Sequence, residues 1–336
     1  MSVRPTPAPG LAAASRTVAG VLAEAAEARA TVVLSGHVNP DADALGSTLA
    51  LAEGLRRRGA RVLATFPGDF TLPASLGWLP GAEGLVPSSS LPSAPDVFVS
   101  LDAASPGRLG EVAPLLDGAV TSIVVDHHAS NPGFGKLRLI DPGAPATVTL
   151  VADLLDDLGV TLDEQLATCL YAGLAADTGS FRFGSTRPQT HELAARLLAT
   201  GIDHAAISRR LFDTAPFGWL GLLSVVTGRA VLEPDVGAGL VWTWSSTAEA
   251  AEHGLPGEQL EALVDVVRAT AEADVAAVLK GADDGSWVVS MRSRGATDVA
   301  RVAMALVGGG HRAAAGYSSS LDREGTIAQL RAELSR

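Results

Sequence analysis

The sequence predicts an α/β protein of two domains, a doubly wound and mainly parallel sheet followed by a smaller mixed sheet. Short apolar segments alternate with helical ones, and three apolar segments in the first half are each followed by an acidic residue. The chain has 336 residues, more than the about 250–300 that one hydrophobic core usually serves. We expect a first domain over 1–210, a helical linker over 211–228 and a second domain over 229–336.

The first domain is predicted as strands and helices in turn. Leu45, Leu49 and Leu55 recur at helical spacing and predict a helix that ends near residue 59. Residues 67–95 are rich in Pro, Gly and Ser, which favours loops with at most a short helix. The predicted strands are 31–35, 61–66, 96–101 and 121–125, and the other predicted helices are 12–28, 148–158, 162–176, 189–199, 204–211 and 217–226.

The second domain shows shorter strands between helices, and no repeat of fixed period is visible. This pattern predicts a small mixed sheet with helices on one side. The predicted strands are 230–232, 239–244, 275–279 and 287–291, and the predicted helices are 257–267 and 299–306.

Charge and composition narrow the classes of function. The formal net charge is -12, from 25 basic and 37 acidic residues, and no block of Lys or Arg forms a basic tract. Proteins that follow a long phosphate backbone normally carry such a tract, so long nucleic acid is not expected as a partner. A small anionic substrate is still compatible with an acidic protein, because bound metal ions can supply local positive charge.

Cysteine content and hydropathy indicate the compartment. The single cysteine, Cys169, lies in an apolar run and should pack in the core, so no disulfide framework or zinc finger is expected. No window holds the about 18 uninterrupted apolar residues that a membrane span needs, and residues 1–10 do not resemble a signal peptide. We therefore expect a cytoplasmic protein with no membrane partner, and the sequence leaves open whether it forms a homodimer.

Polar residues follow the predicted strands at their carboxyl ends, where doubly wound sheets bind ligands. Ordinary roles exist for several of them: Asp41 fits a helix N-cap, Asp43 a first-turn acid and Asp102 a turn residue. Asp177 is harder to explain, because it ends the apolar segment 172–176 and a buried acid must be paired, hydrogen-bonded or metal-bound. The candidates after the strands are His37, Asp41, Asp43, Asp102, Asp126, His127 and His128.

Carboxylate and imidazole donors of this kind suit a pair of ions of the Mn²⁺ or Mg²⁺ class. Two ions about 3.5–4 Å apart repel each other unless anionic oxygens lie between them, so some carboxylates must bridge. Asp102 and Asp177 have no close acidic neighbour in the sequence, and we take them as shared or central ligands. Asp41 and Asp43 would then each serve mainly one ion.

Five blocks in this order resemble those of the DHH-DHHA1 phosphoesterase family. They are residues 37–47, Asp102, 126–131, 177–181 and 308–311, and the resemblance runs from about residue 30 to the end. It implies two Mn²⁺ ions, with Mg²⁺ or Co²⁺ as substitutes. It further implies that Asp126 supports the histidines and that His128 faces the scissile phosphate. The implied ligands are His37 and Asp41 for one ion, Asp43 and His127 for the other, Asp102 for both, and Asp177 on the site.

The second domain supplies candidate substrate contacts. Alternation along the predicted strand puts Arg292 and Arg294 on one face, where they could grip phosphate, although two solvated cations fit the spacing as well. Gly309, Gly310 and His311 could form an anion-binding lip, helped by the N-terminus of a helix that we expect next, and a glycine-rich connector is the alternative. The family resemblance favours substrate binding for this set. A further candidate is Asn131, which could instead serve a turn.

The resemblance implies hydrolysis at phosphorus by a water that the two ions activate. Relatives with this glycine block resemble nanoRNases and pAp phosphatases, which implies very short RNA, dinucleotides such as pApA or cyclic diadenylate, and 3'-phosphoadenosine 5'-phosphate (pAp) as substrates. One alternative is an inorganic pyrophosphatase, polyphosphatase or single-strand exonuclease of the same superfamily. Another is a nucleotide-binding regulator without catalysis, against which the complete ligand set argues.

Overall fold

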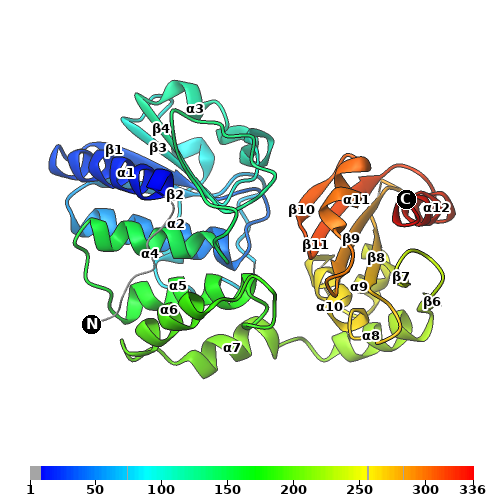
Figure 1. Ribbon diagram of the computed structural model, residues 1–336. Coiled ribbons are helices and arrows are strands. Elements are labelled where there is room, and N and C mark those ends of the chain that lie inside the picture. Colours follow the sequence, from blue (N-terminus) through cyan, green and yellow to red (C-terminus); the bar gives the residue numbers. More distant parts are fainter. Residues whose placement is uncertain (1–8, 74, 256, 283) are drawn as a thin grey trace. The chain divides into compact units, whose positions relative to one another are not determined.

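The computed structural model describes residues 9–336 except 74, 256 and 283. The chain divides into two compact units, Met1–Thr214 and Ala215–Arg336 (Figure 1). Helix α8 (Gly218–Gly228), predicted as a linker, packs Leu222 and Val226 into a core of the second unit. Among the described helices, none combines the length and the hydropathy needed to cross a bilayer.

The first unit is built on a five-stranded parallel sheet of order β2-β1-β3-β4-β5. This is a doubly wound order, and the strand sequence reverses direction between β1 and β3, where such sheets bind ligands. The sequence predicts four of the strands and misses β5, a partly exposed edge strand of only four residues. The strands are β1 (Thr31–Ser35), β2 (Arg61–Thr65), β3 (Val97–Leu101), β4 (Thr121–Asp126) and β5 (Leu137–Ile140).

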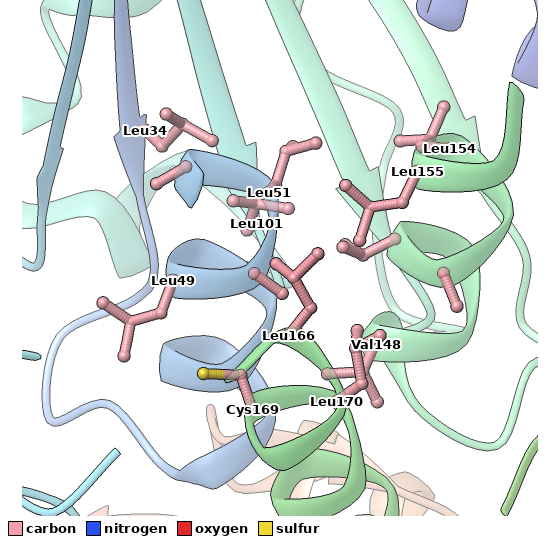
Figure 2. Packing of buried hydrophobic residues seen from close by; sticks show 14 of the residues in the cluster. Leu34, Leu49, Leu51, Leu101, Val148, Leu154, Leu155, Leu166, Cys169 and Leu170 are labelled. Atoms are coloured by element: carbon pink, nitrogen blue, oxygen red, sulfur yellow. The ribbon is translucent and has the colours of Figure 1, made fainter. Parts of the chain in front are cut away.

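Both faces of this sheet are covered, as the predicted fold class requires. On one face, Leu51 of α2, Leu155 of α4 and Leu170 of α5 belong to one core, and Cys169 packs there as predicted (Figure 2). On the other face, Phe98 packs with residues of η3 and α3. The helices of this unit are α1 (Pro9–Glu27), α2 (Ala42–Arg57), α3 (Leu115–Gly118), α4 (Thr147–Asp157), α5 (Glu164–Asp177), α6 (Pro188–Leu198) and α7 (His204–Phe212), with the 3-10 turns η1 (Ala82–Gly84), η2 (Ser88–Ser90) and η3 (Pro106–Val112).

Two glycines let helices α2 and α5 approach each other closely. A Cβ atom at Gly46 would lie 2.4 Å from the carbonyl oxygen of Cys169, and one at Gly173 would lie 3.0 Å from the Cα and the Oδ1 of Asp43. Only glycine fits at such distances. Asp43, in the first turn of α2, is thereby held beside the last turns of α5, which ends at Asp177.

The second unit contains a mixed sheet of order β10-β11-β9-β8-β7-β6, in which β7 and β8 are parallel and the other pairs antiparallel. The prediction of a mixed sheet is therefore confirmed. The strands are β6 (Val231–Glu233), β7 (Leu240–Ser246), β8 (Val275–Gly281), β9 (Trp287–Ser293), β10 (Gly309–His311) and β11 (Ala314–Ser319), and the helical segments besides α8 are α9 (Thr247–Glu252), η4 (Gly257–Ala262), α10 (Leu263–Val267), α11 (Val299–Ala305) and α12 (Arg323–Leu334).

Two predictions for this unit are wrong. Helices cover both faces of the sheet, α11 and α12 on one and α8, α9 and α10 on the other, because β8 is buried along its whole length and needs cover on both sides. The segment after His311 is strand β11 and not a helix, so no helix N-terminus follows the glycines there. Its Ala-rich start resembles a helix in sequence, but Ala315 and Gly316 pair with Met291 and Ser290 of β9.

Candidate functional site

The polar residues at the carboxyl ends of β1, β3 and β4 converge where the strand order reverses. His37 follows β1, Asp102 follows β3 and His127 follows β4. Asp102 lies between the two histidines, with Oδ2 3.7 Å from His37 Nε2 and Oδ1 3.5 Å from His127 Nε2. The carboxyl group of Asp102 therefore presents one oxygen to each histidine.

Among the groups of potential metal ligands in the described residues that include Asp102, two consist entirely of predicted ligands. One contains His37, Asp41 and Asp102, the other Asp43, Asp102 and His127, and in each the donor atoms lie within 4.8 Å of one another. Asp177 adjoins the second group, since its Oδ2 is 3.1 Å from His127 Nε2. These contacts place Asp102 between the groups and Asp177 on the side of the second. All six predicted ligands lie at one end of the parallel sheet.

The two carboxylate oxygens of Asp41 have different roles, one in capping helix α2 and one in facing the site. Its Oδ1 accepts hydrogen bonds from the backbone N–H groups of Asp43 and Ala44, both at 3.0 Å, which makes it the N-cap of α2. Its other oxygen, Oδ2, faces His37 Nε2 at 3.7 Å. The N-cap role predicted as an alternative is real, and it leaves the second oxygen directed to the site.

Asp43 is fully buried and holds the start of helix α4. Its Oδ2 accepts from the backbone N–H of Thr147 at 2.6 Å, and its Oδ1 accepts from that of Val148 at 2.9 Å. Ala146, the N-cap of α4, has no side chain that could accept these hydrogen bonds. The Thr147 hydroxyl also donates to Asp102 Oδ1 at 2.8 Å. The sequence gives no indication of this contact.

Hydrogen bonds to backbone carbonyls orient both candidate ligand histidines. Nδ1 of His127 lies 3.2 Å from the Ala144 oxygen, and Nδ1 of His37 lies 2.8 Å from the Val38 oxygen. A carbonyl can only accept, so the contact of His127 places a proton on its Nδ1 and turns Nε2, the nitrogen that could bind a metal ion, to the carboxylates. For His37 the two contacts of Nδ1 require different tautomers, because the Val38 oxygen can only accept and Arg108 Nη2, 2.8 Å away, can only donate.

Asp126 and Asn131 hold His128. Nδ1 of His128 donates to Asp126 Oδ1 at 2.7 Å, and the Asn131 amide donates to Asp126 Oδ2 at 2.6 Å. Burial by itself would raise the pKa of Asp126, but the hydrogen bonds from His128 and Asn131 lower it below its usual range. Asn131 Oδ1 accepts from the backbone of Gly133, so the structure shows Asn131 bracing this loop, and its contact with substrate stays a prediction.

The electrostatics of the cluster favour a bound cation. Burial and the charge of Asp177 raise the pKa of Asp43 to about 8. Burial and the charges of Asp43 and Asp41 raise the pKa of Asp102 well above its usual range. For His127 burial acts in the opposite direction, but the hydrogen bond and charge of Asp177 raise the pKa to about 10. A divalent cation among these groups would replace the retained protons, so the donor set fits a metal site.

The backbone is strained in the segments that carry the site. Asn39, Asp102, Ser180 and Phe181 all have positive φ, between 51° and 64°. Asn and Asp tolerate this left-handed conformation, whereas Ser and Phe rarely adopt it. Such strain tends to cluster at functional sites, because the surrounding structure must hold it in place.

The candidate substrate residues of the second unit lie on β9 and β10 or next to them. Arg292 of β9 lies opposite Ala276 of β8, on the face of the sheet that α10 covers. Its Nε lies 3.3 Å from Oδ1 of Asp265, which belongs to α10. Arg294 donates to the carbonyl oxygen of Thr270 at 2.7 Å.

The two candidate glycines differ in their surroundings. Gly310 has a backbone reason to be glycine, since its φ is 137° and a Cβ would lie 2.5 Å from the Ala314 oxygen. Within the part of the chain that the structure describes, no atom lies within 4 Å of a Cβ placed at Gly309, so packing there does not require glycine. His311 ends the three-residue strand β10 and pairs with Ala314. That Gly309, Gly310 and His311 contact substrate stays a prediction.

Comparison with known proteins identifies relatives over most of the chain. Residues 31–174 match the model of the DHH family, N-terminal domain, and residues 244–335 match that of the DHHA1 domain. The bifunctional oligoribonuclease and PAP phosphatase NrnA of Thermus thermophilus is 34% identical over 313 residues, which cover 91% of this chain and 90% of that protein. The cyclic-di-AMP phosphodiesterase GdpP of Bacillus subtilis is 23% identical over 88% of this chain and 46% of its own length.

Solved structures share the fold. An exopolyphosphatase-related protein from Bacteroides fragilis superposes with a TM-score of 0.85 at 24% identity, covering 96% of each chain. RecJ of Thermus thermophilus, solved in complex with Mn²⁺, superposes with a TM-score of 0.52 at 18% identity over 98% of this chain and 55% of RecJ. Together with the two matched domains and the Thermus thermophilus relative, the order of the motifs shows that the chain belongs to the DHH-DHHA1 phosphoesterase family.

Proposed function

We propose that the chain is a two-metal phosphoesterase that hydrolyses very short RNA and dinucleotides such as pApA to mononucleotides, and pAp to AMP. The observation that carries this proposal is Asp102, whose two oxygens face two groups of donors, as a bridge between two ions requires. The Thermus thermophilus relative, named for oligoribonuclease and PAP phosphatase activity, supports the substrate class. The net charge of -12 favours small substrates over long nucleic acid.

The proposed cofactors are two Mn²⁺ ions, with Mg²⁺ or Co²⁺ as substitutes. Mixed carboxylate and imidazole donors suit such ions, and the Mn²⁺ bound by RecJ, which shares the fold, supports the choice. When bound, the ions would polarise the phosphoryl oxygens and lower the pKa of water at the site. The proposed ligands are His37 and Asp41 for one ion, Asp43, His127 and Asp177 for the other, and Asp102 for both.

His128 is the proposed catalytic side chain, and Asp126 acts through it. The carboxylate of Asp126 keeps the proton on His128 Nδ1, which fixes the orientation of the ring and directs Nε2 to the scissile phosphate. In the imidazolium form Nε2 would also carry a proton, and a hydrogen bond from it would stabilise negative charge that develops on the phosphoryl oxygens.

The second unit would contribute substrate binding. Arginine guanidinium groups match phosphate geometry, and glycine backbone N–H groups can approach an anion closely. Since β11 and not a helix follows the glycines, this role rests on the N–H groups alone. The proposed contacts are Arg292, Arg294, Gly309, Gly310 and His311. We also propose a cytoplasmic location for this activity.

Cyclic di-AMP is a second candidate substrate. The similarity to GdpP, a cyclic-di-AMP phosphodiesterase, extends over 88% of this chain, so it includes both units. Opening a cyclic diadenylate and cutting pApA break the same type of bond, a phosphodiester between riboses, and one site could serve both.

A side-by-side turnover assay with Mn²⁺ tests the proposal on pAp, pApA, cyclic di-AMP, a long single-stranded RNA and pyrophosphate. We expect AMP from pAp and pApA, and little product from the long RNA. Faster hydrolysis of pyrophosphate than of any nucleotide would support the pyrophosphatase alternative. Binding of pApA without turnover would support a nucleotide-binding regulator, and rapid degradation of the long RNA an exonuclease.

A further inference from the structure

Thr147 contacts two of the candidate ligands with different atoms. Its backbone N–H donates to Asp43 Oδ2 at 2.6 Å, and its hydroxyl donates to Asp102 Oδ1 at 2.8 Å. The side chain is fully buried at the first position of α4. It lies 45 residues from Asp102 in the sequence, so the contact arises from the fold.

The hydroxyl contact restrains the terminal side-chain torsion of Asp102. The terminal torsion of an aspartate side chain has a broad energy minimum, so packing alone fixes the carboxylate plane poorly. A bridging carboxylate must nevertheless direct one oxygen to each ion. In this structure Oδ1 is on the side of His127 and Oδ2 on the side of His37, and the Thr147 hydroxyl holds Oδ1.

A neutral hydroxyl donor also suits the buried surroundings of Asp102. Asp102 is 2% exposed and lies among other carboxylates, so water cannot readily replace a lost hydrogen-bond donor. A neutral hydroxyl fixes the carboxylate without adding a positive charge that would compete with a metal ion. Thr147 is β-branched and fully buried, which leaves few side-chain torsions open to the hydroxyl.

We infer that Thr147 is a positioning residue that sets the orientation of the Asp102 carboxylate and thereby the affinity for both metal ions. The inference rests on the proposed metal site and goes beyond it, because Thr147 is not among the proposed ligands. Loss of a group that supports a metal ligand typically lowers metal affinity about 10- to 100-fold.

Thr147→Val is the critical variant. It keeps the shape of the side chain and the N–H bond to Asp43, and it removes only the hydroxyl contact. Thr147→Ser restores a hydroxyl at the same position. Thr149→Val is the matched control, because Thr149 lies in the same turn of α4 and its hydroxyl donates to the Ala146 carbonyl at 2.7 Å, away from the site.

The measurement is Mn²⁺ binding to the full chain by isothermal titration calorimetry without substrate, followed by kcat and KM for pAp at saturating Mn²⁺. We expect Thr147→Val to bind Mn²⁺ about 10- to 100-fold more weakly, whereas Thr147→Ser and Thr149→Val stay close to the wild type. In Thr147→Val, kcat at saturating Mn²⁺ should fall while KM stays close to the wild-type value.

Two failures can be told apart. If the wild-type chain binds Mn²⁺ and Thr147→Val binds it equally well, the inference about Thr147 is wrong and the metal site stands. If Thr147→Ser is as weak as Thr147→Val, the hydroxyl is not the cause and the inference is also wrong. If the wild-type chain binds no divalent ion, the proposed metal site itself is refuted.

Discussion

The close contact between α2 and α5 can be tested by adding one methyl group at Gly173. In Gly173→Ala the new Cβ would lie 2.6 Å from Val148 Cγ1 and 3.0 Å from both the Cα and the Oδ1 of Asp43. Neither neighbour can yield easily, because one is a β-branched side chain in a helix and the other includes backbone. Overpacking of this kind costs about 1–3 kcal/mol.

The control is Gly20→Ala in helix α1, where a Cβ would have no atom within 4 Å. Replacing Gly by Ala within a helix should stabilise both variants by about 1 kcal/mol. The difference between their free energies of unfolding therefore measures the steric clash alone. We expect Gly173→Ala to have the lower free energy of unfolding by about 1–3 kcal/mol, as measured by urea denaturation. It should also bind Mn²⁺ more weakly, because Asp43 is displaced. Equal stability of the two variants would refute the close approach of the helices.

Three further predictions address the site. Asp102→Asn keeps a residue that tolerates the φ of 59° but removes the charge, so Mn²⁺ binding and turnover of pAp should both be lost, as followed by calorimetry and phosphate release. Asn131→Ala should lower kcat more than it raises KM if its main role is to hold Asp126, and a change confined to KM would instead indicate substrate contact. In chelator-treated protein, burial raises the pKa of Asp43 from 3.8 to about 8, so folding favours its protonated form. The unfolding temperature should therefore fall as pH rises through 8, and Mn²⁺ should reduce this dependence, whereas stability that rises over that range would contradict the shift.

The sequence alone predicts the elements whose patterns are local. The apolar strands of the first unit and the polar residues at their carboxyl ends need only a window of a few residues to be seen. His37, Asp102 and His127 could thus be named as neighbours, because the carboxyl ends of parallel strands meet at one edge of the sheet. Strand β5 and the strand after His311 were missed or misassigned because pairing partners, and not local periodicity, decide them.

The sequence by itself determined the fold class, the family and the set of candidate ligands. Only the tertiary structure decided how these side chains are oriented, which oxygen of Asp102 faces which histidine and what holds it there. The N–H groups that hold Asp43 come from residues 104 and 105 positions away, and the hydroxyl on Asp102 from Thr147, 45 positions away. Contacts of that separation leave no periodic pattern in a sequence, because helix packing brings them together.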